Sequence, residues 1–396
     1  MARVLHACLL LVVATSADDE WSSHTKCAPP AVTWSRVDAR DSAARFVPEI
    51  AALGHALVSL EHVNLNLPAG AEPNATAFYV GALGFAPDPR AAAVCARTRA
   101  AGGGMASLHW MNIGLQQLHL PVEPPAPQRV RGSLGLEFAD LDALAARLRA
   151  ARVPARWRGG GEGEEERWLE LACPVTGTDI RAHAPPRARG GGWLGPAPRL
   201  DERCGAHAAA RPPGGASLGL GLRDVEFVVP RRPRGGGAAT AARVCAFYEA
   251  YFGARATVAD GGARCAVAVG LHQALVFRDA VGSEEVGEYD GHHIAVYVNG
   301  FAAAYERLAR AGLVWDNPRF PHLTYPNLSA ALGHAEFRVR TIADPETGEA
   351  LYELEHEVRS LEHATFSGRA WLGEPPPAEA ATCDDATPGR GASPGG

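Results

Sequence analysis

Side chains that can bind a transition metal occur at four places in the sequence, each in a stretch typical of a β-strand. They are His62 in LEHVNLNLP, His119 in NIGLQQLHLP, His293 in GHHIAVYV and Glu353 in LYELEHE. Neutral imidazoles and a carboxylate suit Zn, Fe, Ni, Co or Mn. A metal with open coordination positions could act as a Lewis acid on two neighbouring substrate oxygens, or could bind oxygen if it is Fe(II). No Gly-x-Ser-x-Gly motif appears, so a serine hydrolase has no support.

The histidines also have a purely structural interpretation. His62 alternates with polar neighbours such as Asn64, and His119 has a similar setting. Hydrogen-bonded residues that line a cupped sheet would show the same alternation. His292 precedes His293 and would face the other side of the strand, so the register of this histidine pair stays open.

The acidic residue has alternatives of its own. Glu353 shares its strand face with Glu355 and Glu357, because residues two apart in a strand point the same way. Glu355 could therefore be the ligand in place of Glu353. A solvated acidic face would also produce this series, and the sequence leaves the choice open.

The composition indicates a globular protein. Its 396 residues, 47% of them hydrophobic, are enough for two or three domains with sizeable cores. The 38 basic and 44 acidic residues give a net charge of −6, without a basic stripe of the kind that binds phosphate backbones. We therefore expect a small-molecule ligand or substrate and no nucleic-acid partner.

Residues 1–17 have the pattern of a cleaved signal peptide. Arg3 is followed by an apolar run from Val4 to Ala14 and then by small residues before Asp18. The run is too short to span a membrane, and a buried N-terminal element is the alternative. We expect secretion, or retention in the lumen of the secretory pathway, without a membrane partner.

The cysteines give no metal motif. Seven remain beyond Cys8, widely spaced and without a Cys-x-x-Cys pair, which excludes the usual zinc ribbon. An odd number leaves at least one thiol unpaired if the others form disulfides. The sequence does not say which cysteines would pair.

Two stretches rich in Gly and Pro divide the chain. Residues 185–217 lack a helical or strand period and are predicted to form a linker. Residues 373–396 are too poor in apolar side chains to order themselves and are predicted to be a disordered tail. Two segments remain, 57–184 and 218–365.

The two segments carry the same motifs in the same order. AFYVGALGF (77–85) corresponds to AFYEAYFGA (246–254), and NIGLQQLHLP corresponds to AVGLHQALVF when Gly114 is aligned with Gly270. In both segments a strand and an amphipathic helix follow. Each segment further divides into two units of a strand, a helix and more strands. The chain therefore contains four similar units produced by duplication of long segments, unlike a solenoid of short repeats.

These motifs resemble those of the vicinal oxygen chelate superfamily, which includes glyoxalase I, fosfomycin-resistance proteins and extradiol dioxygenases. The resemblance rests on a first strand His-x5-Pro, a helix with Ala-Phe-Tyr-x4-Gly, a later strand His-x4-Val, and a closing Asp-Pro-x(1-2)-Gly-x4-Glu-Leu. It implies an α+β fold of four βαβββ modules that form two glyoxalase-like domains, 57–184 and 218–365. Paired modules would close a cupped sheet around a divalent metal.

The resemblance also implies a ligand set, because the superfamily's metal ligands come from the first and last strands of each module. The first module supplies His62 and His119, and the fourth supplies His293 and Glu353, which is also the expected catalytic residue. The corresponding residues of the second and third modules would form a degenerate site. They are Ser133, Ala182, Asp224 and Leu275.

Cross-pairing of the first module with the fourth is needed to assemble that ligand set. Glyoxalase I proteins with four modules in one chain pair their modules in this way, and pair the second with the third. His119 departs from that enzyme, in which a glutamate is expected. A triad of Asp224, His293 and Glu353 within the second segment is the alternative, although it has one carboxylate more than the two-His-one-carboxylate set of dioxygenases.

Two functions follow as hypotheses. The first is a metal-dependent lyase, isomerase or dioxygenase that acts on a small molecule with adjacent oxygens. The second is a metal-free protein that binds a small ligand in its cup, as bleomycin-resistance-like proteins do. Cross-paired modules would favour the enzyme, and segments that each close on themselves would favour the binding protein, since the fold alone does not decide.

Overall fold

The computed structural model describes residues 56–100, 106–114, 116–159, 167–184, 191–192, 195–196, 217–231, 238–270, 273–284, 286–363 and 365. The predicted signal peptide and tail lie outside these residues. So does most of the predicted linker, apart from Ser217 and two paired two-residue strands, β9 (Gly191–Gly192) and β10 (Gly195–Pro196). No helix among the described residues is long and apolar enough to cross a membrane.

The first segment contains two modules. The elements of module 1 are β1 (Leu57–Asn64), α3 (Glu72–Thr76), η1 (Ala77–Ala82), β2 (Ala86–Pro87), α4 (Arg90–Ala100), β3 (Ser107–Ile113) and β4 (Gln116–Val122). Those of module 2 are β5 (Gly132–Phe138), α5 (Leu141–Ala150), β6 (Ala155–Gly159), β7 (Arg167–Ala172) and β8 (Asp179–His183). Helix α4 is an addition to the predicted βαβββ order.

The second segment repeats this order. The elements of module 3 are β11 (Gly219–Val229), α7 (Thr240–Phe247), η2 (Tyr248–Phe252), β12 (Ala256–Ala259), η3 (Asp260–Gly262), β13 (Arg264–Val269) and β14 (Gln273–Asp279). Those of module 4 are β15 (His293–Val298), α8 (Phe301–Arg310), α9 (Leu328–His334), β16 (Glu336–Ala343) and β17 (Ala350–Ser360). One strand of module 4 is reduced to a single bridge between Val314 and Val339. The predicted α+β fold of four βαβββ-type modules is confirmed.

The helices form where the sequence supplies an apolar face and a start signal. Asp140 caps α5, because its carboxylate accepts hydrogen bonds from the backbone N–H groups of Asp142 and Ala143. Leu144 and Leu148 lie on the buried face of the same helix, four residues apart. Both Ala-Phe-Tyr stretches contain a short π-helical turn, η1 and η2, so the duplicated motif has a similar local structure twice.

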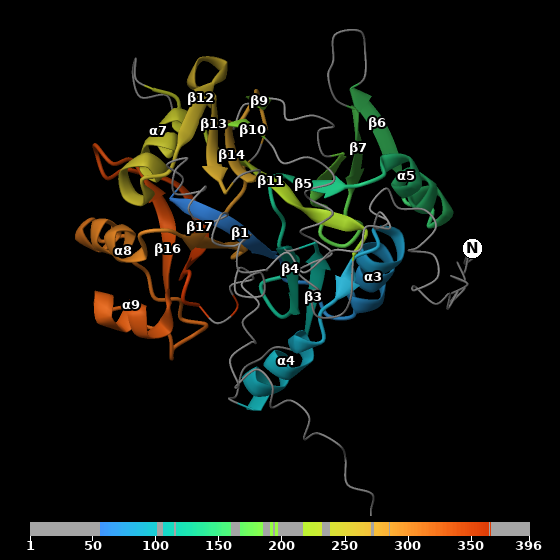
Figure 1. The fold of residues 1–396 in the computed structure, drawn as a ribbon, viewed down its shortest axis with the longest axis horizontal. Helices are drawn as coiled ribbons and strands as arrows, with labels where there is room; N and C mark the ends of the chain where they lie inside the picture. Colours follow the sequence, from blue (N-terminus) through green and yellow to red (C-terminus); the bar gives the residue numbers. More distant parts are fainter. Residues whose placement is uncertain are drawn as a thin grey trace, which may run out of the picture.

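The two sheets each combine strands from both sequence segments (Figure 1). The first has the order β16-β17-β15-β1-β4-β3-β2, and the second has the order β12-β13-β14-β11-β5-β8-β7-β6. Antiparallel pairing of β1 with β15 joins modules 1 and 4, and antiparallel pairing of β11 with β5 joins modules 2 and 3. In Figure 1 the blue strand β1 accordingly lies among the orange strands of the C-terminal module. The boundaries of the sheets therefore differ from those of the segments 57–184 and 218–365.

Two hairpin glycines hold the sheets against each other. Gly114 and Gly270 have φ angles of +60° and +57°, a region that favours glycine. A side chain on Gly114 would strike the backbone of Leu220 in β11, and one on Gly270 would strike the backbone of Val58 in β1. The glycine alignment seen in the sequence thus marks equivalent contacts between the sheets. A single cluster of buried apolar side chains extends through both.

Candidate metal centre

The middle strands of the first sheet bring histidines from both segments to one face. His62 lies opposite Ala295 of β15, and Ala295 lies opposite Glu357 of β17, so these three residues form one row across the sheet. His293 lies two residues before Ala295 and points to the same side. Pairing of β1 with β15 is therefore what places His62 beside His293.

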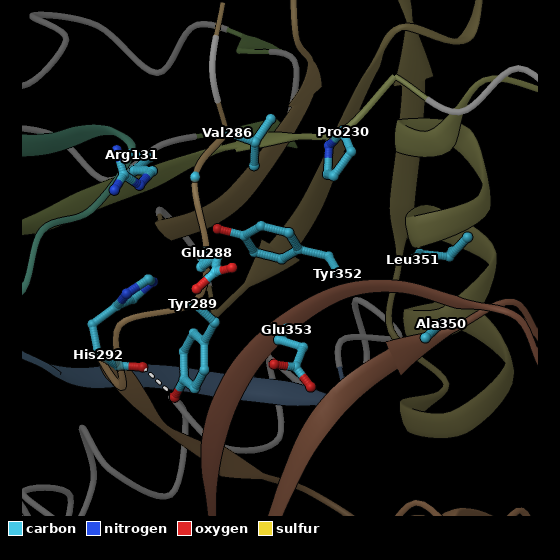
Figure 2. A pocket seen from close by; sticks show the side chains of 11 residues that line it. Arg131, Pro230, Val286, Glu288, Tyr289, His292, Ala350, Leu351, Tyr352 and Glu353 are labelled. Atoms are coloured by element: carbon cyan, nitrogen blue, oxygen red, sulfur yellow. Dashed lines mark hydrogen bonds between the residues drawn. The ribbon is translucent and has the colours of Figure 1, made fainter.

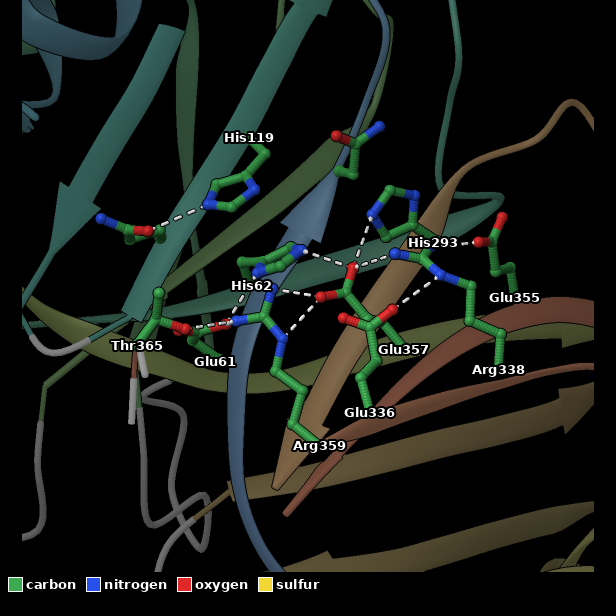
Figure 3. A network of polar contacts seen from close by, with 12 residues as sticks. Glu61, His62, His119, His293, Glu336, Arg338, Glu355, Glu357, Arg359 and Thr365 are labelled. Carbon is green, nitrogen blue, oxygen red and sulfur yellow. Dashed lines mark hydrogen bonds and ion pairs between the residues drawn. The ribbon is translucent and has the colours of Figure 1, made fainter. Parts of the chain in front are cut away.

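His62, His293 and Glu357 form a group that could hold a metal ion (Figure 3). One ligand atom from each side chain lies within 4.8 Å of the others, and all three residues are buried. The Oε2 atom of Glu357 is 3.7 Å from Nε2 of His293 and 4.0 Å from Nε2 of His62. Among the described residues this is the one group of three or more potential ligands that converges in this way.

A β-bulge aims His62 at the other two ligands. The register of β1 against β15 shifts between Leu60 and His62, which inserts Glu61 as an extra residue. Consecutive side chains can then reach the same polar centre, and Oε2 of Glu61 lies 3.0 Å from Nδ1 of His62. Because this contact places the proton on Nδ1, Nε2 keeps its lone pair, and no described residue forms a hydrogen bond with Nε2.

His119 lies beside the group rather than within it. Its ring stacks on His62 with a centroid separation of 3.7 Å, and on Trp110 with a separation of 4.5 Å. Its Nε2 atom lies 2.9 Å from the side-chain oxygen of Gln117. In this arrangement His119 fixes the plane of the His62 ring.

Glu353 does not join the histidines. Strand β17 runs parallel to β15 with His293 opposite Glu355, so Glu353 lies beyond the first residue of β15. Its carboxylate is partly exposed and lies 3.3 Å from the guanidinium of Arg340. The carboxylate that reaches the histidines is Glu357, four residues further along the strand face noted in the sequence. The register of β17 against β15 is what identifies Glu357, because strand periodicity alone does not separate it from Glu353 and Glu355.

Two buried arginines bind the acidic side of the centre. Arg338 donates to Oε2 of Glu357 at 2.9 Å and to Oε1 of Glu355 at 2.5 Å, and Arg359 contacts Glu357 and Glu61. Four carboxylates share these two guanidinium groups. The carboxylates are Glu61, Glu336, Glu355 and Glu357. Negative charge therefore exceeds positive charge in this buried cluster.

The protonation states at the centre suit metal ligands. Burial lowers the pKa of His62, His119 and His293 below that of an exposed histidine, which keeps the imidazoles neutral. Burial alone would raise the pKa of Glu357, but Arg359 and Arg338 outweigh it and hold this pKa well below the usual range. Burial and the neighbouring Glu357 raise the pKa of Glu336 to about 7.

The residues present fit a divalent transition metal. Two neutral imidazoles and one ionised carboxylate are a suitable donor set, and the unpartnered Nε2 of His62 is the atom such an ion would bind. A divalent ion would also offset the excess negative charge of the cluster. The contacts of Glu357 with Arg338 and Arg359 oppose metal binding, because they already occupy lone pairs of this carboxylate.

The second sheet has no equivalent group among its described residues. Ala182 and Leu275 are buried and apolar, while the Ser133 hydroxyl is buried and has no hydrogen-bond partner in the described part of the chain. Asp224 is also in this sheet, on β11, which is not hydrogen-bonded to β15 or β17, so the alternative triad with His293 and Glu353 does not share a sheet. These four positions are chemically unlike the His62 centre.

Comparisons with known proteins find similar structures but no similar sequence. No family model matches the chain, and no curated protein matches it. A glyoxalase I variant from Zea mays shares 12% identity with a TM-score of 0.46, and the match covers 80% of this chain and 95% of that one. A candidate dioxygenase from Bacillus subtilis shares 12% identity with a TM-score of 0.44, covering 77% and 86%.

A shorter match is the fosfomycin-resistance protein FosX from Listeria monocytogenes. It shares 14% identity with a TM-score of 0.25, and the match covers 32% of this chain and 91% of FosX. That protein was solved with Mn(II) and a dihydroxypropylphosphonic acid. All three are of the glyoxalase, dioxygenase and fosfomycin-resistance types that the sequence motifs resemble. The strand order of the chain itself establishes the fold, because it is the order of paired βαβββ modules.

Proposed function

We propose that this chain is a metal-dependent enzyme of the vicinal oxygen chelate type, with one metal site formed by modules 1 and 4. The observation that carries the proposal is the convergence of His62, His293 and Glu357 from two sequence segments onto one face of a sheet. The substrate class is a small molecule with two adjacent oxygens. The reaction is a lyase, isomerase or dioxygenase reaction.

In this proposal His62, His293 and Glu357 hold the metal. A bound divalent ion would supply Lewis acidity toward the adjacent oxygens of the substrate. Glu61 orients His62 through Nδ1, as carboxylates commonly do behind metal-bound histidines. His119 keeps the His62 ring in place by stacking, and its low pKa leaves it neutral at physiological pH.

A metal-free binding protein is the second candidate, and one observation favours it. Oε2 of Glu357, which faces both histidines, accepts a hydrogen bond from Arg338 at 2.9 Å, and Oε1 accepts one from Arg359. This carboxylate is thus charge-paired without a metal. In that case the histidines and arginines would instead bind polar groups of a small ligand directly.

Metal analysis of the purified protein separates these candidates. We expect about one equivalent of a divalent transition metal per chain, since ligands converge at a single place in the described residues. His62→Ala and His293→Ala should lose it, and so should Glu357→Gln. Glu353→Gln is the matched control, because Glu353 lies on the same strand but pairs with Arg340, and it should keep the metal.

A folded protein without metal, unchanged by His62→Ala and His293→Ala, would reject the enzyme hypothesis and leave the binding protein. If metal is present, substrates of the glyoxalase and dioxygenase types are the first to test. Circular dichroism of each variant shows whether metal loss is caused by unfolding. This control matters most for Glu357→Gln, because that change removes one charged partner from each of two buried arginines.

The secretory route remains a proposal, and a disulfide supports it. Cys245 of α7 and Cys265 of β13 form a disulfide bond, while Cys95 and Cys173 are buried free thiols. Disulfides persist mainly in oxidising compartments. N-terminal sequencing of protein from its natural source tests the proposal, with a mature chain beginning near Asp18 as the expected result.

A further inference from the structure

A pocket lies at the start of β17, away from the His62 centre (Figure 2). Its volume is about 290 Å³, enough for a small metabolite. The loop that precedes β15 forms one wall, the first residues of β17 form another, and Arg131 and Pro230 complete the lining. None of His62, His293 and Glu357 lines it.

His292 presents an unsatisfied nitrogen to this pocket. The residue is only 3% exposed, and its Nδ1 atom lies 2.6 Å from Oδ1 of Asp290. The imidazole stacks on Phe227 at a centroid separation of 6.0 Å and lies against Tyr289 at 5.4 Å, so its ring is fixed. In the neutral tautomer that donates from Nδ1 to Asp290, Nε2 is an acceptor, and Nε2 has no hydrogen-bond partner among the described residues. A buried acceptor of this kind is costly unless a ligand or water donates to it.

Charges of both signs also line the pocket, from Arg131 and Glu288. The guanidinium of Arg131 packs over Gly287, a glycine with φ +70° whose missing side chain leaves the space for it. Neither Arg131 nor Glu288 forms an ion pair with another residue in the described part of the chain. Figure 2 shows the imidazole of His292 and the phenol oxygen of Tyr352 directed toward the same side of the pocket as Arg131.

We propose that this pocket is a binding site for a small zwitterion of the α-amino-acid class. Arg131 would bind the carboxylate in the bidentate manner that guanidinium groups favour. The ammonium group would donate to Nε2 of His292 and lie near Glu288. A simple anion would meet the negative charge of Glu288, and a simple cation would meet the positive charge of Arg131. A zwitterion complements the unpaired charges and the orphan acceptor together.

Calorimetric titration of the full chain with three related probes tests this proposal. L-Leucine has both charges, N-acetyl-L-leucine lacks the ammonium, and L-leucinamide lacks the carboxylate. We expect L-leucine to bind, and each derivative to bind at least about tenfold more weakly, because each loses a charge-assisted contact.

Substitutions assign the binding to this pocket. Arg131→Gln, and His292→Phe, which keeps the ring stacking but removes Nε2, should each weaken L-leucine binding at least about tenfold. Arg129→Gln removes a half-exposed arginine two residues away and should change nothing. His62→Ala should also leave L-leucine binding intact, which separates this site from the metal centre. Failure of L-leucine to bind, equal binding of N-acetyl-L-leucine, or equal affinities of Arg131→Gln and Arg129→Gln would each overturn the proposal.

Discussion

At the scale of single residues, the centre depends on a local irregularity of one strand. Glu61 and His62 are neighbours, and in a regular strand their side chains would point to opposite faces. The bulge in β1 lets both reach the same polar cluster, where Glu61 holds Nδ1 of His62. The orientation of the imidazole is therefore set before any metal arrives.

This orientation gives the first prediction. Glu61→Gln should lower metal affinity by about 10- to 100-fold, the usual effect of removing a carboxylate behind a metal-bound histidine. Competition with a chelator of known affinity measures it, with Glu353→Gln as the control. The thermal midpoint without metal should be recorded as well, because Glu61 also contacts Arg359 and Tyr297. Unchanged affinity in a folded Glu61→Gln protein would remove Glu61 from the site.

The second prediction concerns His119. A phenylalanine at this position can keep the stacking between His62 and Trp110 while it removes both ring nitrogens. Because Nε2 of His119 is hydrogen-bonded to Gln117, we expect His119→Phe to retain about one metal ion per chain. Elemental analysis of His119→Phe measures its metal content. Loss of the metal would instead make His119 a fourth ligand, as the resemblance to the superfamily implies.

At the scale of elements, buried ion pairs connect the repeated modules. Arg243 of α7 donates to Asp344 at 2.5 Å, in the Asp-Pro turn between β16 and β17, and to Glu349 at 2.5 Å. Asp344 also accepts the backbone N–H of Glu346 and stabilises the turn. This cluster joins a helix of module 3 to the hairpin of module 4, and hence one sheet to the other.

The third prediction tests that connection. Asp344→Asn should lower the free energy of unfolding by about 3 kcal/mol at pH 7, because it leaves the buried Arg243 without its main partner. Glu349→Gln, at a half-exposed position, should cost less. Denaturant unfolding measures both, and equal effects of the two substitutions would contradict the ranking.

The same pair should make stability depend on pH. Burial alone would raise the pKa of Asp344, but hydrogen bonds from Arg243 and from the backbone of Glu346 outweigh it and lower this pKa below its ordinary value of 3.8. A depressed folded-state pKa means that the contribution is complete above the unfolded-state pKa and is lost as the pH falls through the folded one. The difference between the native protein and Asp344→Asn should therefore be constant near neutrality and shrink below about pH 4.

At the scale of the whole molecule, the duplicated segments are exchanged between sheets. Strand β1 of the first segment pairs with β15 of the second, and β5 of the first pairs with β11 of the second. Neither segment closes its own sheet. A segment on its own would expose two long, largely buried strands at open edges, which is a condition that promotes aggregation.

The fourth prediction follows from this exchange. A protease site inserted between residues 197 and 216, outside the described elements, should allow cleavage without separation of the halves. The two fragments should elute together in size-exclusion chromatography and retain the metal, since two strand pairs still join them. The segment 57–184 expressed alone should be aggregated or unfolded. Fragments that separate in native buffer while staying folded would contradict the cross-paired topology.

Much of the architecture could be predicted because it depends on local patterns. Alternating strands, the paired Ala-Phe-Tyr helices and the aligned Gly114 and Gly270 indicated four modules, and the structure has them. His62 and His293 were also identifiable, as histidines on strands of the right modules. The carboxylate partner was not, because Glu353, Glu355 and Glu357 are equivalent in strand periodicity, and the register of β17 against β15 distinguishes them.

The sequence by itself determined the repeat, the module type and the chemical kinds of side chain available, because strand period, turn glycines and ligand types are properties of short stretches. The tertiary structure decided which modules share a sheet, which of three glutamates meets the histidines, and that His292 and Arg131 face a common pocket. The physical reason is that each of these depends on pairing between strands or loops far apart in the chain. Such pairing is set by packing of the complete core, and no local pattern specifies it.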